Sequence, residues 1–591
     1  MRIEPRTSPT PRPTPAPGLA SESTGTRPLT PSPTAPLGAP DSLTITDAAR
    51  PTTSSSLSDL VAKAKEAAAK QPEWTMAINL AASLGDQFGA VSKGQQLRDL
   101  AKETEGKPVT IVAQQAMHGE DGPVVERFVI KDGKVTSMGQ SPSEGFAQDL
   151  EALTAMAATD HPARRMGVVI QSHGNASDGM SGDNGAAPLG EVTQALRDGL
   201  ASSGRSRLDV LNFDACLMGQ QEVLSAVRGL ADHVVASPEV ELANGSMLGG
   251  KIDGQPTQEM LRALLATPEM DGEALARKSV ELASQAARPF DVDEDGKADP
   301  DRAPMNATPT LAHYSMAKVE GMSQAVNGLG SALREALKDP KNREAIAEII
   351  SRTPRFSAAS AEGEGVGLQQ RDLKRFSEGL EAAIAQGKLA DPSGKLKKAA
   401  QATLEALDAL VTSYHGEEAG DNASGRPQNY REMGGLGVFM PSVEFLSGTP
   451  ETLATPLEQI TLNAEVFAKQ VRAPEMTADE RSRAKEFFLR GAGGAMGEIW
   501  SRLPEAQQNA FTPLRDAYFA LEKAETPAAI ASAATRFGEV AAKLQDGPMG
   551  RLITEQKTNE RRELVAEAYA LAEPHMTDGW RQFTAALRAA N

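Results

Sequence analysis

Short apolar runs alternate with amphipathic stretches through the middle of the chain. Apolar residues recur three and four positions apart, as in helices, over 146–158, 191–202 and 220–230. Between and around these stretches lie compact apolar runs, at 109–116, 123–129, 166–173, 208–216 and 233–239. Strands and helices that alternate at this spacing predict βαβ units and a parallel sheet. Functional side chains in such sheets gather where the strands end.

The same pattern divides the whole chain into regions. Residues 1–56 are dominated by Pro, Ser, Thr and Ala and are predicted to be a disordered tail. Residues 57–104 are predicted to form a helical lead-in or pro-segment, and 105–450 an α/β domain whose late strand is 434–442. Residues 455–591 are predicted to form a separate helical bundle. The predicted fold class is therefore α/β, a mostly parallel sheet flanked by helices, with an all-helical C-terminal region and a disordered N-terminus.

Two of the three tryptophans, Trp500 and Trp580, fall in the helical C-terminal region. Large aromatic side chains in an amphipathic helix are usually core residues. We therefore expect both to pack inside the bundle rather than to bind a ligand.

Composition narrows the function. A net charge of −18 argues against a nucleic-acid partner, because phosphate binding needs a basic face. No apolar run is long enough to span a membrane. The first residues lack the apolar stretch of a standard secretory signal, which leaves a bacterial-type cytoplasm or a specialised export route open.

The chain has one cysteine, Cys216, so disulfides within the chain and multi-cysteine zinc sites are excluded. A single thiol is more often an inert buried residue than a reactive one. Cys216, however, follows a predicted strand directly and precedes a predicted helix. We expect the helix N-terminus to lower the pKa of the thiol and to favour the nucleophilic thiolate.

A cysteine nucleophile needs a base within hydrogen-bond reach. Of seven histidines, His173 ends the preceding predicted parallel strand and is followed by Gly174. The rival is His118, also followed by glycine, but it lies between two runs that resemble a hairpin. We therefore predict that His173 is the base, with the N–H groups of Gly174 and Cys216 as an oxyanion hole.

Four segments together resemble the clostripain family of peptidases: GVVIQSHGN, SGDNGAAPLGEVTQAL, LDVLNFDACLMGQQEV and HVVASPEVELANG. The resemblance covers roughly 105–445. It implies a caspase-like α/β fold and a cysteine endopeptidase with a Cys–His dyad that needs no third member. It further implies protein or peptide substrates cleaved after Arg or Lys.

The resemblance also implies a role for Asp214, two residues before the nucleophile, in the pocket for the basic P1 side chain. A carboxylate there is suited to pair with a guanidinium; the alternative is that Asp214 only caps a helix. The family tends to carry Gly-Trp downstream, where this chain has Gly245-Ser246. Members of the family also mature by self-cleavage between His and Cys, which here favours the run SSGRSR at 202–207.

A second motif, DVDEDGKADPD at 291–301, has the carboxylate spacing of a calcium loop. Its expected ligands are four aspartates, Asp291, Asp293, Asp295 and Asp299. Arg302 stands where an EF-hand has glutamate, so the motif is closer to shorter DxDxDG loops. The alternative is a solvated acidic loop, and the proposed chemistry itself requires no cofactor.

Two further functions stay open from the sequence. One is a non-catalytic interaction or effector protein on a peptidase scaffold, which the long C-terminal region suits. The other is a different thiol enzyme, such as an acyltransferase. The presence of both dyad residues favours the peptidase.

Overall fold

The computed structural model describes most of the chain from residue 72 onward. The described ranges are 72–81, 90–119, 121–241, 255–285, 287–288, 305–306, 309–356, 369–421, 427–442, 445–446, 455–474 and 476–590. The predicted tail 1–56 lies outside them.

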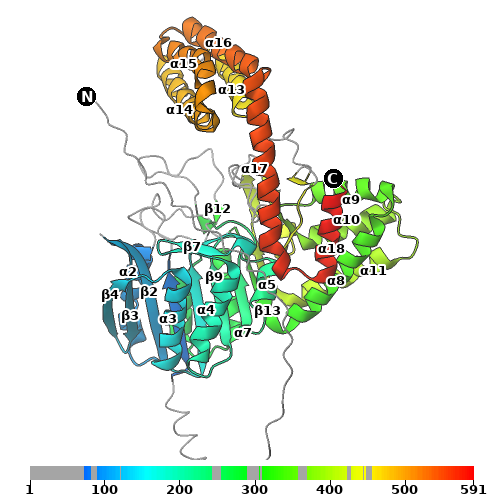
Figure 1. Cartoon of the computed structure of the whole chain (residues 1–591). Helices are drawn as coiled ribbons and strands as arrows, with labels where there is room; N and C mark the ends of the chain where they lie inside the picture. Colours follow the sequence, from blue (N-terminus) through cyan, green and yellow to red (C-terminus); the bar gives the residue numbers. More distant parts are fainter. Residues whose placement is uncertain are drawn as a thin grey trace, which may run out of the picture. The chain divides into compact units, whose positions relative to one another are not determined.

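A nine-stranded sheet forms the centre of the fold (Figure 1), in the order β15-β13-β10-β9-β5-β1-β2-β3-β4. Its five central strands, from β10 to β2, run parallel, and antiparallel strands extend it at both edges. In chain order the strands are β1 (Trp74–Leu80), β2 (Val109–Gly119), β3 (Gly122–Lys131), β4 (Lys134–Pro142), β5 (Arg165–Gln171), β9 (Leu208–Asp214), β10 (Ala231–Ala236), β13 (Thr310–Ser315) and β15 (Val411–Gly416).

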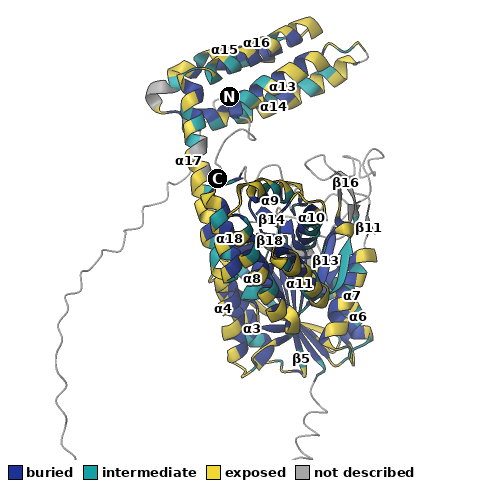
Figure 2. Ribbon diagram, turned by 90° about the vertical axis from the view of Figure 1, so that its right-hand side faces the viewer, coloured by how far each residue is buried: buried dark blue, intermediate teal, exposed yellow. Residues whose placement is uncertain are grey.

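Helices cover both faces of the sheet, and the buried residues lie between the layers (Figure 2). Side chains alternate along each strand, so β1 sends Ala77 to one core and Met76 and Ile78 to the other. One face is covered by α3 (Phe146–Thr159), α4 (Leu189–Ala201) and α8 (Val319–Ala336), and the other by α2 (Ala90–Asp99), α6 (Thr257–Ala266) and α7 (Gly272–Gln285). This arrangement confirms the predicted α/β class.

The prediction that 57–104 is a helical segment is wrong for residues 74–80. These residues are β1, which lies in the middle of the sheet between β5 and β2. All seven side chains are buried, because helices cover both faces of the strand. A strand buried on both sides shows no period of two, so a short apolar run does not distinguish it from a helix. The sheet domain therefore begins before residue 105.

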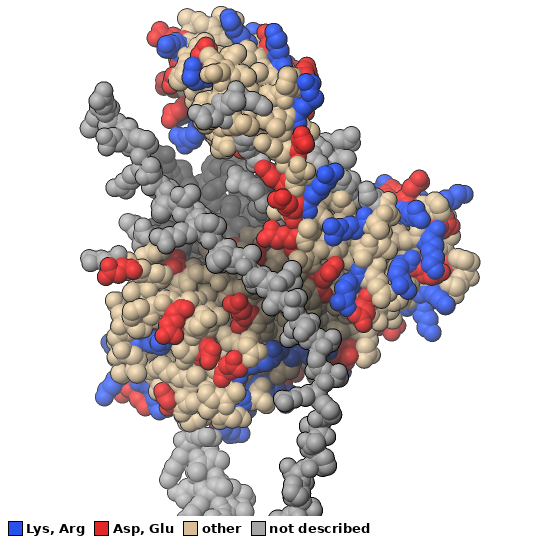
Figure 3. Space-filling view, in the orientation of Figure 1, with Lys and Arg blue, Asp and Glu red and all other residues tan. Residues whose placement is uncertain are grey.

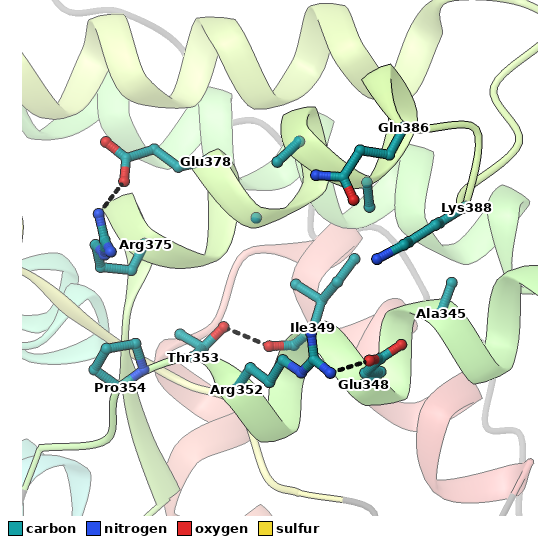
Figure 4. Close-up of a pocket in the computed structure, with 13 residues that line it drawn as sticks. Ala345, Glu348, Ile349, Arg352, Thr353, Pro354, Arg375, Glu378, Gln386 and Lys388 are labelled. Carbon is teal, nitrogen blue, oxygen red and sulfur yellow. Dashed lines mark hydrogen bonds and ion pairs between the residues drawn. The ribbon is translucent and has the colours of Figure 1, made fainter.

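The predicted late strand also differs in its partner. Residues 437–439 form β18 (Gly437–Phe439), but this strand pairs with β14 (Gln370–Asp372) in a separate two-stranded sheet. Near this small sheet the chain is helical, with α9 (Pro340–Arg352), α10 (Leu373–Ala385) and α11 (Lys395–Leu410). A pocket of about 440 Å³ lies between α9 and α10, and Arg352, Arg375 and Lys388 are among its lining residues (Figure 4).

The C-terminal region is helical as predicted. Four helices share their own core: α13 (Pro456–Gln470), α14 (Ala478–Arg502), α15 (Thr512–Lys523) and α16 (Pro527–Gln545). A long helix, α17 (Pro548–Ala572), contributes Met549 and Ile553 to that core, but its later residues Val565 and Tyr569 pack in the core of the sheet domain.

The last helix, α18 (Asp578–Ala589), belongs to the sheet domain rather than to the bundle. Trp580 is fully buried in the sheet domain's core, whereas Trp500 is 42% exposed. The expectation that both tryptophans fill the core of a separate bundle is therefore wrong. Helical periodicity shows that α18 buries one face, but it does not show which domain receives that face.

In the part of the chain described, no helix is long and apolar enough to cross a membrane. On the face drawn in Figure 3, Lys and Arg side chains are interspersed with Asp and Glu.

The packing of α8 against α18 predicts opposite effects for two glycines of α8. A Cβ at Gly330 would lie 2.5 Å from the backbone of Gly579, whereas nothing lies within 4 Å of a Cβ at Gly328. We expect Gly330→Ala to lower the free energy of unfolding by roughly 1–3 kcal/mol through overpacking. The control Gly328→Ala should raise it by about 0.5–1 kcal/mol, because alanine is the better helix former. Urea unfolding of both variants measures the difference; equal effects would contradict the close packing.

Candidate active site

Two neighbouring parallel strands in the middle of the sheet end just before the residues of the predicted dyad. β5 and β9 pair in register, and the last pair of this ladder is Gln171 with Asp214. His173 and Cys216 each follow two residues after this pair. The two strand ends lie side by side, about 5 Å apart as neighbouring strands do.

Backbone packing draws the two segments closer still. Gly174 follows His173 in the short strand β6 (His173–Gly174). A Cβ at Gly174 would lie 2.3 Å from the backbone oxygen of Cys216, so the position requires glycine. The His-Gly segment therefore packs directly against the backbone of the candidate nucleophile, and the His173 side chain is exposed.

His118 also lies near the carboxyl end of a strand, but that strand is farther from Cys216. It is near the end of β2, and β5 and β1 separate β2 from β9. Three strand spacings amount to about 14 Å, beyond the reach of an imidazole hydrogen bond. Its Nε2 instead lies 3.7 Å from a carboxylate oxygen of Asp183.

The surroundings of Cys216 differ from those expected. The next helix, α5 (Gln221–Ala226), is only six residues long and begins five residues after Cys216. Burial and the nearby Glu241 carboxylate raise the pKa of the Cys216 thiol to about 12. The expected lowering of the thiol pKa by a helix N-terminus is therefore wrong for this structure, in which the Sγ donates to the backbone oxygen of Glu241 at 3.5 Å.

The loop after Cys216 is held in an uncommon conformation. Leu217 has φ of 60°, in the left-handed region that residues with side chains rarely adopt. Its N–H donates to the oxygen of Glu239 at 3.1 Å, and the Gly219 N–H donates to the oxygen of Ser237 at 2.8 Å. These bonds fix residues 216–220, here called the nucleophile loop, against the segment that follows β10.

Asp214 lies beneath this loop and is 3% exposed. Its oxygens accept hydrogen bonds from the Gln255 N–H at 3.0 Å and from the Thr257 hydroxyl at 3.1 Å. The carboxylate thus anchors the start of α6, a capping role for a different helix from the one considered in the sequence. The pocket role predicted for Asp214 stays a prediction.

A second carboxylate, Glu241, lies beside Asp214. The Gln255 side chain donates to Glu241 Oε1 at 2.9 Å while its backbone N–H donates to Asp214. Cys216 thus contacts Glu241, and Gln255 contacts both Glu241 and Asp214. The sequence pattern assigned no role to Gln255, whereas Glu241 lies in the segment HVVASPEVELANG that carries the family resemblance.

Apolar side chains from distant segments pack beside the thiol. Cys216 packs against a cluster formed by Ala176, Leu217, Phe356, Tyr430 and Met433. Phe356 and Tyr430 come from the region around the small β14–β18 sheet. The sequence pattern gave no indication that this region reaches the site.

Glu222, on the first turn of α5, is a buried acid close to the nucleophile in sequence. It is 1% exposed, and its Oε1 accepts the Phe439 N–H at 3.1 Å. Burial raises the pKa of this carboxyl to about 7. The acid is therefore mostly protonated below about pH 7.

The predicted self-cleavage loop lies at the amino end of β9, opposite the end that carries Cys216. Residues 202–207 precede β9, whereas Cys216 follows it, and seven strand residues span about 20 Å. Arg205 pairs with Asp209 at 3.2 Å and Arg207 with Asp232 at 2.9 Å.

The predicted calcium ligands Asp291, Asp293, Asp295 and Asp299 lie outside the described residues. The antiparallel pair β11 (Ala287–Arg288) and β12 (Met305–Asn306) flanks that segment. Among the described residues, no group of three or more His, Cys, Asp or Glu side chains is suited to hold a metal ion. Calcium binding stays a prediction from the sequence.

Comparison with known families gives one match to a family model. Residues 96–353 match the model of the clostripain family, Peptidase_C11. The matched region contains both strand ends that carry His173 and Cys216. This part of the chain is therefore similar to the clostripain family of cysteine peptidases. No curated protein sequence matches the chain.

Solved structures of clostripain-family (C11) proteases resemble the chain at low identity. A secreted C11 cysteine protease from Bacteroides thetaiotaomicron, in complex with an irreversible peptide inhibitor, is 14% identical, with a TM-score of 0.42, covering 62% of this chain and 92% of its own. An inactive zymogen C11 protease from Parabacteroides distasonis is 14% identical, with the same TM-score, covering 63% and 92%.

The buried Glu222 predicts a pH dependence of stability. Its folded-state pKa of about 7 lies above the ordinary value of 4.5, so its contribution is full below pH 4.5 and is lost as the pH rises through 7. The loss should amount to ~3 kcal/mol. Because Glu222→Gln cannot titrate, we expect the difference in unfolding free energy between wild type and variant to change across pH 4.5–7.5. A constant difference in denaturant titrations across this range would contradict the raised pKa.

Proposed function

We propose that the protein is an endopeptidase that cleaves after Arg or Lys, with Cys216 as nucleophile and His173 as base. One observation carries the proposal: the close packing of Gly174 on the Cys216 backbone at the ends of the paired strands β5 and β9. Through this contact the backbone of Cys216, which carries the only thiol of the chain, lies against the segment that begins with His173. Among the described residues, His173 is the only histidine that directly follows a parallel strand next to β9.

The chemistry follows from these groups. His173 takes the thiol proton while the Cys216 sulfur attacks the scissile carbonyl carbon, and the N–H groups of Gly174 and Cys216 stabilise the oxyanion. The intermediate collapses as the C–N bond breaks, and the His173 imidazolium protonates the leaving amine. A water molecule, deprotonated by His173, then hydrolyses the thioester and releases the free thiol.

Charge around the thiol supports a basic P1 residue. Asp214 and Glu241 both contact Gln255, and the Glu241 carboxylate raises the pKa of Cys216 after the larger effect of burial. A guanidinium or ammonium group bound beside Asp214 and Glu241 offsets the effect of the Glu241 carboxylate on the thiol. A cationic substrate thereby favours the thiolate that attacks it, so charge acts on the chemical step as well as on binding.

Two histidine variants test the dyad. We expect Cys216→Ala and His173→Ala to lower kcat/KM for an arginine amide reporter at least about 1,000-fold, because nucleophile and base act as a unit. His118→Ala, at the same sheet edge, should stay within about twofold of wild type. If His118→Ala lost all activity while His173→Ala retained it, His118 and not His173 would be the base. Turnover of neutral amides at the same rate would remove the basic specificity.

We propose further that self-cleavage at 202–207 takes place between molecules. The loop and Cys216 lie at opposite ends of β9, so one folded chain does not present its own loop to its own thiol.

The cleavage rate distinguishes the two routes. The first-order rate constant for processing should rise in proportion to protein concentration, and added wild type should cut the Cys216→Ala chain. Arg205→Gln combined with Arg207→Gln should block the cut, while Arg197→Gln on α4 serves as the matched control. A rate constant independent of concentration would sink the intermolecular route; mass spectrometry of the products measures it.

A further inference from the structure

The last helix of the chain is built into the sheet domain. Trp580 of α18 is fully buried, with its ring 6.3 Å from that of Phe376 and 5.1 Å from that of Phe583. The backbone of Gly579 approaches Gly330 of α8, and its N–H donates to Asn327 Oδ1 at 2.7 Å. α18 therefore occupies one defined position on α8.

From this position Trp580 contacts β18 through a buried hydrogen bond. The indole Nε1–H donates to the backbone oxygen of Phe439 at 2.9 Å. The Phe439 ring also meets Tyr569 of α17 edge to face, with ring centroids 5.4 Å apart. Both C-terminal helices thus fix the same residue of β18.

The other side of β18 holds the segment that follows the nucleophile. The Phe439 N–H donates to Glu222 Oε1 at 3.1 Å, and the Gly437 N–H donates to the backbone oxygen of Gly219 at 3.1 Å. Gln220 forms a parallel bridge with Gly437, and its side chain donates to the oxygen of Pro238 at 2.9 Å. Residues 219–222 are therefore held between β18 and the segment that follows β10.

We propose that Trp580 is a positioning residue for Cys216 and acts through the hydrogen bonds from its indole to Phe439 and from Phe439 to Glu222. The inference rests on the proposed role of Cys216 as nucleophile. Two buried bonds in series join the indole to Glu222 on the first turn of α5, directly after the loop that carries the thiol. Each leaves a buried polar group without a partner if it is broken. β18 then loses its fixed place, and the nucleophile loop loosens with it.

Because Cys216 is the only thiol in the chain, its alkylation rate reports on the loop directly. Trp580→Phe keeps an aromatic ring and removes the N–H donor. In the full-length protein we expect kcat for an arginine amide to fall about tenfold with KM within twofold. Alkylation of Cys216 by iodoacetamide should be at least about fivefold faster, because the partly buried thiol becomes more accessible.

Phe583→Leu is the matched control. It removes comparable packing volume from the same helix but touches neither hydrogen bond, so both rates should stay within about twofold of wild type at a temperature where the variant is folded. Glu222→Gln retains an acceptor for the Phe439 N–H and should behave like wild type in alkylation. Glu222→Ala removes that acceptor and should match Trp580→Phe, and the double variant should add nothing further.

An alkylation rate of Trp580→Phe within twofold of wild type overturns the proposal, whatever happens to kcat. An equal acceleration in Phe583→Leu also overturns it, since loss of packing alone then explains the effect. Absence of peptidase turnover in wild type counts against the proposed function only, because the alkylation measurements still decide whether Trp580 positions the thiol.

Discussion

The pairing of β5 with β9 determines where the chemistry takes place. Both strands are buried between helical layers, so neither can shift register without moving its apolar side chains out of the core. The pairing fixes the ends of the two strands, and the backbone of Gly174 then settles against Cys216. A buried hydrogen-bonded ladder therefore sets the geometry of the site and the positions at which the exposed loops around it begin.

The strands set the position of the thiol, and its surroundings set its pKa. A nucleophile at the N-terminus of a long helix would be held as thiolate at rest. Cys216 instead lies five residues before a six-residue helix and close to Glu241, and its thiol is protonated at neutral pH. Such a resting state protects the thiol from oxidants and stray electrophiles, which react with the thiolate. In the proposed mechanism, the reactivity of the thiol then depends on the cation that binds beside Glu241.

Much of the fold could be read from the sequence, because strands that alternate with helices leave a strong pattern. The ends of β5 and β9, with His173 and Cys216, were found in this way. β1 was mistaken for helix because burial on both faces removes the alternation that marks a strand. Phe356 and Tyr430 could not be found, since they reach the site by tertiary packing of segments far apart in the chain. Trp580 was assigned to the wrong core for the same reason.

The connection between Trp580 and Phe439 spans 141 residues, with the four-helix bundle between them. A domain whose core includes a helix made after such an insertion cannot finish folding while it is being synthesised. The ribosome must first release the bundle and then α18, so β18 and the loop beside Cys216 take their final places late. The nascent chain thus carries an unfinished site for most of its synthesis. The order of translation thereby delays completion of the candidate site until α18 has been made.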